Sequence, residues 1–470
     1  MTTVAQVHPL DLDPSLVEQR TYTTRRRRHL LDAGAVLCLT AASGILISSP
    51  QVLPGLAGIG RPVTVIGLLV TAGWAVAKLH PRLAVRGPQP LRWAAAIYLG
   101  AMLCSYASGF IRGLPPIEAN AADRTMILCI VYVGVALMAA DGLANRTRLD
   151  ELLWVLVALG TVMALIGHIQ FVLSIDLVAY LQLPGLVDHQ EAVGTRGRGA
   201  GFFQVASTAA HYIEFSTVMA LLLPFAIHIA RFGRTSTVRQ LAIAAAMVIA
   251  AAVPVTLSRT GFVGLAVGLL VMGLFWDMRT RFNVAVFAAG LTAALIVVRP
   301  GLLGTLRALF ASAGDDPSVQ GRTEDYGPAF AYVAEHPWFG RGVGTFIPTL
   351  YRFIDNDWLV HLITVGYVGT AAYAGWHITA IALSIAAFRR SERAEDKHLC
   401  ACLIAAQITA MVVAFFFDAL AFTTHTTVLA ILTGAAGAMW RFTHPSRQVR
   451  SSSPRLGPTG GLLRRLLARR

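Results

Sequence analysis

Apolar runs of about twenty residues, separated by short polar segments, recur along most of this chain. A hydrocarbon core of about 30 Å takes roughly 20 apolar residues per helix. The runs are rich in Leu, Ala, Val, Gly and Ile and lack the ten-residue alternation of a membrane barrel. We therefore expect an all-α polytopic integral membrane protein. The pattern predicts about twelve spans, which begin near residues 29, 57, 91, 123, 150, 206, 238, 259, 281, 356, 399 and 420.

Polar stretches divide this pattern into a membrane domain and two tails. The membrane domain is expected over 29–440, between basic cytoplasmic tails at 1–28 and 441–470. Two sizeable segments, 175–205 and 299–355, are expected on the outer face. A transporter rarely needs an arginine- and carboxylate-rich insert of the second kind, whereas a membrane-embedded transferase does. We therefore expect the insert to act as a catalytic loop.

The net charge of +14 indicates membrane orientation rather than nucleic-acid binding. Arg25 to Arg28 precede the first predicted span, and with the N-terminus inside, most Lys and Arg residues fall in cytoplasmic segments. This distribution satisfies the positive-inside rule and predicts that both termini are cytoplasmic. The run 461–470 is basic and amphipathic, which suits either an anionic lipid surface or a solvated tail.

The cysteines predict neither a disulfide framework nor a metal site. All five fall inside predicted spans or at a cytoplasmic end, and none has CxxC or ligand spacing. They are Cys38, Cys104, Cys129, Cys400 and Cys402.

Arginines on the predicted outer face suggest an anionic ligand. The positive-inside rule disfavours basic residues there, and guanidinium groups bind phosphate through bidentate, charge-assisted hydrogen bonds. Arg198 follows glycine in the first outer segment, Arg259 begins a span, and Arg322 and Arg341 lie in the insert. A diphosphate ligand would explain all four. The alternative is that they pair with loop carboxylates or lipid phosphate.

Three further polar residues stand at predicted helix starts. His211 and Glu214 are spaced i, i+3, so they share one helical face as a supporting polar pair, either for a site or only for the helix start. Asp355 opens the tenth span, where a carboxylate acts as a general base or as an N-cap. An Asp-x-Asp metal site for nucleotide sugars is disfavoured, because this end faces outward.

Taken in order, these residues resemble the O-antigen ligase and O-antigen polymerase superfamily of lipid-linked glycan transferases. The resemblance covers about 195–375 and rests on the segments His211-Tyr-Ile-Glu-Phe215, Leu257-Ser-Arg-Thr-Gly261 and Gly321 to Phe346, followed by Asp355-Asn356. It implies surface-polysaccharide assembly at the outer face of a bacterial cytoplasmic membrane. Glycan would be transferred from an undecaprenyl-diphosphate-linked donor to a hydroxyl of a glycan or lipid acceptor, without cofactor or metal. Polysaccharide-assembly proteins are possible partners, beside the membrane lipids. The diphosphate would be held by Arg259 and Arg322, then by Arg198 and Arg341.

The chain also departs from that family. Ligases typically have His-Asn where this chain has Asp355-Asn356, and Glu-x-Gly where it has Thr364-Val-Gly366. Asp355 is therefore our candidate base, with His361 as the second candidate. The missing histidine slightly favours a polymerase over a ligase.

A twelve-span transporter or lipid-linked glycan flippase is the alternative function. Charged residues are sparse at the predicted span midpoints, where a substrate pathway or proton relay needs them. This argues against the transporter, and the outer insert argues for the transferase.

Overall fold

The computed structural model describes residues 32–56, 58–80, 87–189, 196–198, 202–298, 301, 304–305, 307, 311 and 317–445. Nearly all of the two predicted tails, the amphipathic run 461–470 and parts of both outer segments lie outside the described residues. The long helices are α2 (Ala33–Leu46), α3 (Pro62–Leu79), α4 (Pro90–Arg112), α5 (Pro116–Gly142), α6 (Arg146–Leu173), α7 (Tyr212–Phe232), α8 (Ser236–Val255), α9 (Arg259–Phe275), α10 (Met278–Val298), α14 (Asp357–Arg390), α15 (Ala394–Val413) and α16 (Thr423–Thr443).

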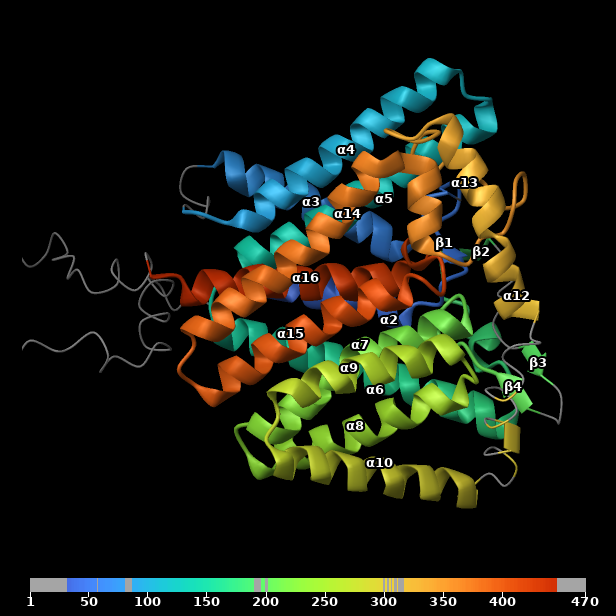
Figure 1. Cartoon of the computed structure of the whole chain (residues 1–470). Helices are drawn as coiled ribbons and strands as arrows, with labels where there is room; N and C mark the ends of the chain where they lie inside the picture. The colour runs from blue at the N-terminus through green and yellow to red at the C-terminus, as the bar shows by residue number, and fades with distance from the viewer. Residues whose placement is uncertain are drawn as a thin grey trace, which may run out of the picture.

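Shorter elements gather at one end of this bundle (Figure 1). They are α12 (Pro317–Glu324), α13 (Tyr326–Glu335), the antiparallel pair β1 (Gln51–Val52) and β2 (Val187–Asp188), and the hairpin β3 (Arg196–Arg198) and β4 (Phe202–Gln204). We call the end that carries α12, α13 and the start of α14 the site end. The opposite end carries Lys78, Arg92 and Arg146, and we call it the basic end.

The all-helical membrane fold predicted from the sequence is confirmed. Within the described residues, eight helices are long and apolar enough to cross a membrane: α3 to α8, α14 and α15. The apolar helices α2 and α9 are shorter. The count of twelve spans and the orientation of the termini therefore remain predictions, as do the domain limits.

The interior of the bundle is built around α7 and α16, whose side chains are buried on nearly all sides. In Figure 1, α16 runs through the middle of the molecule. Small residues allow close helix approach, as is common in membranes. A Cβ added to Gly434 of α16 would lie 2.2 Å from the carbonyl oxygen of Ala136 in α5. Helices α5 and α16 therefore pack backbone against backbone.

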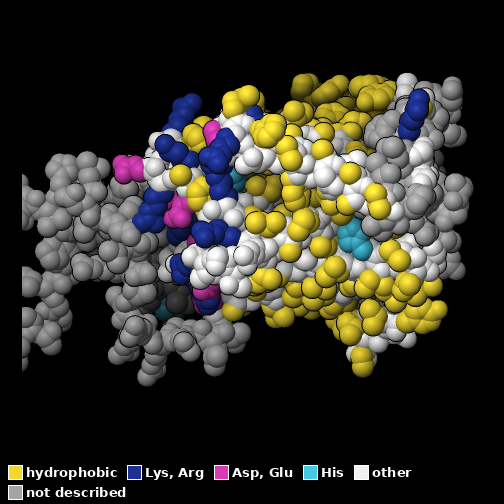
Figure 2. Space-filling view, turned by 90° about the horizontal axis from the view of Figure 1, so that it is seen from below, with side chains coloured by type: hydrophobic (Ala, Val, Ile, Leu, Met, Phe, Trp, Pro, Cys, Tyr) yellow, Lys and Arg dark blue, Asp and Glu magenta, His cyan; other side chains and the backbone are white. Residues whose placement is uncertain are grey.

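The outer helices present apolar side chains to their surroundings. Leu69, Ile97, Leu270 and Phe282 are exposed on α3, α4, α9 and α10. Figure 2 shows a broad apolar face with Lys and Arg side chains gathered toward one end. A soluble protein rarely exposes so large an apolar surface, whereas a bilayer requires it.

Helix α14 is broken at Gly366, and the insert fills the break. Gly366 has φ 64° and ψ −168°, a conformation open essentially to glycine alone. The amides of Arg341 and Gly342 donate to the carbonyls of Ile363 and Thr364, each at 3.0 Å. In the opposite direction, Tyr367 donates to Pro337 at 2.8 Å. The insert thus supplies partners for backbone groups that an apolar medium cannot satisfy.

The first prediction follows from this break in α14. Replacing Gly366→Ala places a Cβ 2.6 Å from backbone atoms of Gly340 and Trp338 and forces an unfavourable φ. We expect the insert to detach and the purified protein to lose about 2 kcal/mol of stability or more. The measurement is the thermal midpoint of the detergent-solubilised protein.

Gly375→Ala is the matched control, because Gly375 lies in the same helix with nothing within 4 Å of an added Cβ. Equal midpoints for the two variants would contradict the role assigned to the break.

Candidate functional site

The start of α14 places a buried carboxylate among polar partners. Asn356 caps the helix by accepting from the amide of Leu359 at 3.1 Å. The next residue, Asp357, is buried, and its Oδ2 accepts from the Tyr373 hydroxyl at 3.1 Å. Its amide donates to the carbonyl of Ala414 at 2.8 Å, which fixes the start of α14 against the end of α15.

His361 lies one turn below Asp357 and faces it. Its Nδ1 is 3.1 Å from the carbonyl oxygen of Asp357 and 3.6 Å from the carboxylate Oδ1. Because both neighbours are acceptors, the proton of the neutral imidazole lies on Nδ1, and Nε2 is the acceptor atom. The ring stacks on Tyr373 with centroids 4.4 Å apart. Asp357 and Tyr373 therefore fix the orientation of the His361 ring.

Asp418 completes this buried cluster from the loop between α15 and α16. Its side chain lies within hydrogen-bonding reach of Asp357. Burial, and then the negative charge of Asp357, hold the pKa of Asp418 well above the usual aspartate value.

Asp355 and Arg322 meet at the surface beside the cluster. Asp355 is 61% exposed, and its Oδ2 lies 3.5 Å from Nη2 of Arg322 in α12. The Nε atom of Arg322 is buried and has no hydrogen-bond partner among the described residues. A buried donor without a partner calls for an acceptor, such as an anionic ligand or water. The structure thus brings together two of the predicted site residues.

Arg341 is engaged by protein groups rather than by open solvent. Its guanidinium lies over the rings of Tyr332 and Tyr351, with the charge 5.2 and 4.5 Å from the centroids. Nη2 donates to the Tyr351 hydroxyl at 2.8 Å, and Nη1 is 3.7 Å from Glu335. Glu118 accepts from Tyr351 and pairs with Arg112 at 2.6 Å. Arg341 therefore ties the insert to α4 and α5, and its predicted diphosphate role stays a prediction.

Arg259 begins α9 next to a strained backbone. Ser258 caps the helix by accepting from Gly261 at 3.2 Å, and Leu257 has a left-handed φ of 51°. The carbonyl of Leu257 accepts from Gln204 of β4 at 3.4 Å. Arg198 lies in β3, which pairs with β4, so the hairpin connects the two predicted arginines. The side chain of Arg198 lies outside the described residues.

His211 and Glu214 cap two different helices. His211 accepts from the amide of Ile213 at 3.2 Å and so caps its own helix, α7. Glu214 is fully buried, and its carboxylate accepts from the amides of Ala210 and Thr424 at 2.8 Å each and from His425 at 3.3 Å. It therefore fixes the start of α16 against the start of α7.

Sequence reasoning missed a second polar cluster, in which His228, His398 and Cys402 place three potential metal-ligating atoms within 4.8 Å. The signal was the i, i+4 spacing of His398 and Cys402. However, the Trp276 indole donates to Nε2 of His398 at 3.0 Å, which leaves the His398 proton on Nδ1, 3.1 Å from His228. A metal-ligating histidine needs the opposite tautomer, so these residues fit a hydrogen-bonded cluster better than a metal site.

The second prediction follows from the capping role of Glu214. Glu214→Gln would turn an amide N–H toward one of the backbone donors, and each buried group left unpaired costs about 1–3 kcal/mol. We expect a lower thermal midpoint of the solubilised protein, whereas the exposed Glu324→Gln should leave it unchanged. A midpoint unchanged in both variants would contradict the capping role.

Comparison with known proteins bears on the same region. A comparison with curated proteins gave no match. The family model described as O-Antigen ligase matches residues 243–374, which run from within α8 through α9, the insert and the first half of α14. Over these residues the match confirms the resemblance to the O-antigen ligase and polymerase superfamily that was seen in the sequence.

Proposed function

We propose that this protein transfers glycan from an undecaprenyl-diphosphate-linked donor to an acceptor hydroxyl at the site end, in the assembly of a surface polysaccharide. The observation that carries the proposal is the contact of Arg322 with Asp355 beside the buried cluster of Asp357, His361 and Asp418. The family match supports polysaccharide assembly in general. The donor, the outer-face location and the acceptor are part of the proposal.

In the proposed reaction, the arginines stabilise the leaving group. The bond between the anomeric carbon and the diphosphate oxygen breaks, and the negative charge that develops on the diphosphate is balanced by Arg322 and Arg259. Arg322 is suited to this role because it keeps a buried donor without a protein partner among the described residues. Arg198 and Arg341 are the further candidates, and Arg341 acts through the position of the insert.

The acceptor hydroxyl forms the new bond to the anomeric carbon and loses its proton to a base. Asp355 is our first candidate because it is exposed and stands beside Arg322, so an acceptor reaches it directly. His361 is the second candidate, since its Nε2 is the acceptor atom of a ring oriented by Asp357. Displacement from the face opposite the diphosphate inverts the anomeric centre.

Polymerase and ligase differ only in the acceptor. The aspartate at position 355, where ligases have histidine, slightly favours a growing glycan chain as the acceptor. No observation favours the transporter.

The third prediction concerns the arginines. Arg322→Ala and Arg259→Ala should each slow donor consumption in isolated membranes by about a hundred- to a thousand-fold, by analogy with the loss of an oxyanion donor. Arg389→Ala, which removes an exposed arginine at the basic end of α14, should leave the rate unchanged. If both site-end variants kept near-normal turnover while stably inserted, the diphosphate assignment would fail.

The fourth prediction separates the two bases. If Asp355 takes the proton, Asp355→Asn lowers kcat at least a hundred-fold, while His361→Gln has a smaller effect through packing on Tyr373. The reverse order of effects would assign the base to His361. Products are separated by size, so that a ladder indicates a polymerase and a single shifted product a ligase.

A further inference from the structure

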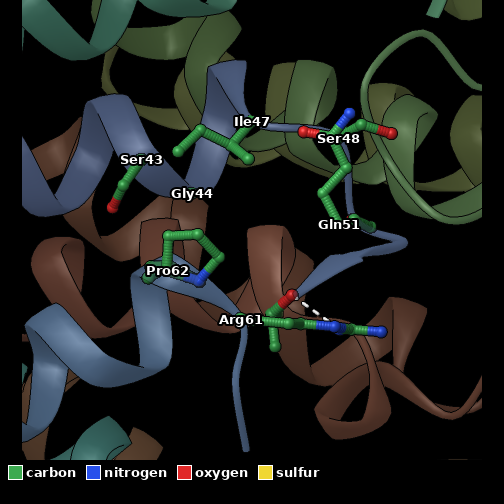
Figure 3. Close-up of a pocket in the computed structure, with 10 residues that line it drawn as sticks. Ser43, Gly44, Ile47, Ser48, Gln51, Arg61 and Pro62 are labelled. Carbon is green, nitrogen blue, oxygen red and sulfur yellow. Dashed lines mark hydrogen bonds between the residues drawn. The ribbon is translucent and has the colours of Figure 1, made fainter. Parts of the chain in front are cut away.

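A small pocket of about 10 Å³ lies at the site end, on elements that the proposed reaction does not use, and Arg61 is the charged residue of its lining. Arg61 immediately precedes α3, and its Nη1 donates to the hydroxyl of Thr423 at the start of α16 at 2.8 Å. Figure 3 shows Arg61 with Ser43, Ser48 and Gln51 around this pocket. The lining comes from the end of α2, the loop before α3 and the start of α16.

Arg124 of α5 brings a second positive charge to Arg61. A Cβ added to Gly58, three residues before Arg61, would lie 3.4 Å from Cδ of Arg124, so the loop rests on the Arg124 side chain. Burial, despite the nearby charge of Glu214, lowers the pKa of Arg61, and the charge of Arg124 lowers it further. The fold therefore holds two positive charges close enough to repel each other.

Neither arginine is ion-paired within the described part of the chain. The carboxylate close to Arg61 is Glu214, and its oxygens already accept from three backbone amides. Arg124 is exposed and is neither hydrogen-bonded nor ion-paired to another described side chain. Arg61 and Arg124 therefore have no ion-pairing partner of their own among the described residues.

Gln51 adds an acceptor to the same pocket. Its Nε2 donates to the carbonyl of Leu181 at 2.6 Å, which fixes the orientation of the amide. Its Oε1 is buried and has no hydrogen-bond partner among the described residues. The pocket thus offers Gln51 Oε1 to a hydroxyl or a water, while the two arginines beside it call for an anionic group.

We propose that Arg61 and Arg124 bind the phosphate group of a lipid at the site end, with Gln51 accepting from a neighbouring hydroxyl or water. Guanidinium groups match phosphate oxygens in pairs, and the position between helix ends suits a headgroup at the membrane interface. Two sources carry this chemistry: a bilayer phospholipid such as phosphatidylglycerol, and a lipid-linked diphosphate. The inference concerns binding and holds whether or not the chain transfers glycan.

The experiment measures binding to the purified full-length protein in nanodiscs of phosphatidylcholine. The probes are phosphatidylglycerol, undecaprenyl diphosphate and inorganic pyrophosphate, and the variants are Arg61→Gln and Arg124→Gln. Loss of one charge-assisted hydrogen bond weakens affinity about ten- to a hundred-fold. Arg389→Gln is the matched control for an equal loss of charge at the other end, and Arg61→Lys should retain part of the affinity.

Weakening confined to phosphatidylglycerol would support the site and identify a bilayer lipid as its source. Weakening for undecaprenyl diphosphate and pyrophosphate would support it and identify the lipid-linked diphosphate. Unchanged affinity of the exposed Arg124→Gln variant for every probe would overturn the inference, even if Arg61→Gln failed to fold.

Discussion

The site end depends on one exchange of backbone hydrogen bonds, at the break of α14. A helix within a bilayer normally satisfies its own amides and carbonyls, and leaving them unpaired is costly. Here Gly366 interrupts that pattern, and the loop that contains Arg341 supplies the missing partners for Ile363 and Thr364. The insert is therefore part of the membrane fold. It cannot move far without exposing backbone groups in α14.

The same exchange explains why the polar residues of the site converge. Because the loop is fixed on α14, Arg341 is held between Tyr332 and Tyr351 and connects to Glu118. The helices α12 and α13 precede this loop, and Arg322 reaches Asp355 where α14 begins. Below that contact, Asp357 is held by Tyr373 and by the end of α15. The insert and the start of α14 therefore hold both the surface charges of the site and its buried hydrogen bonds.

The sequence predicts the helical membrane fold well because hydrophobic length is a local property. The start expected near 259 agrees with Ser258 as the cap of α9, and the start near 356 agrees with Asn356 as the cap of α14. The family resemblance was likewise visible in short segments such as Leu257 to Gly261.

The partners of polar residues depend on distant parts of the chain and could not be predicted. Glu214 was paired in sequence with His211, but it accepts from Thr424 and His425 of α16. Asp418 drew no attention as a lone acid between apolar runs, although it faces Asp357. Local spacing identifies which residues share a helical face. It does not identify the helix that faces them.

We propose that this protein breaks the bond between glycan and lipid diphosphate. The most direct measurement is the release of undecaprenyl diphosphate by the purified wild-type protein in vesicles that contain donor, acceptor and no other protein. The account predicts one released lipid diphosphate for each glycan transferred. Movement of the donor between leaflets with its glycosidic bond intact would contradict it and would indicate a flippase.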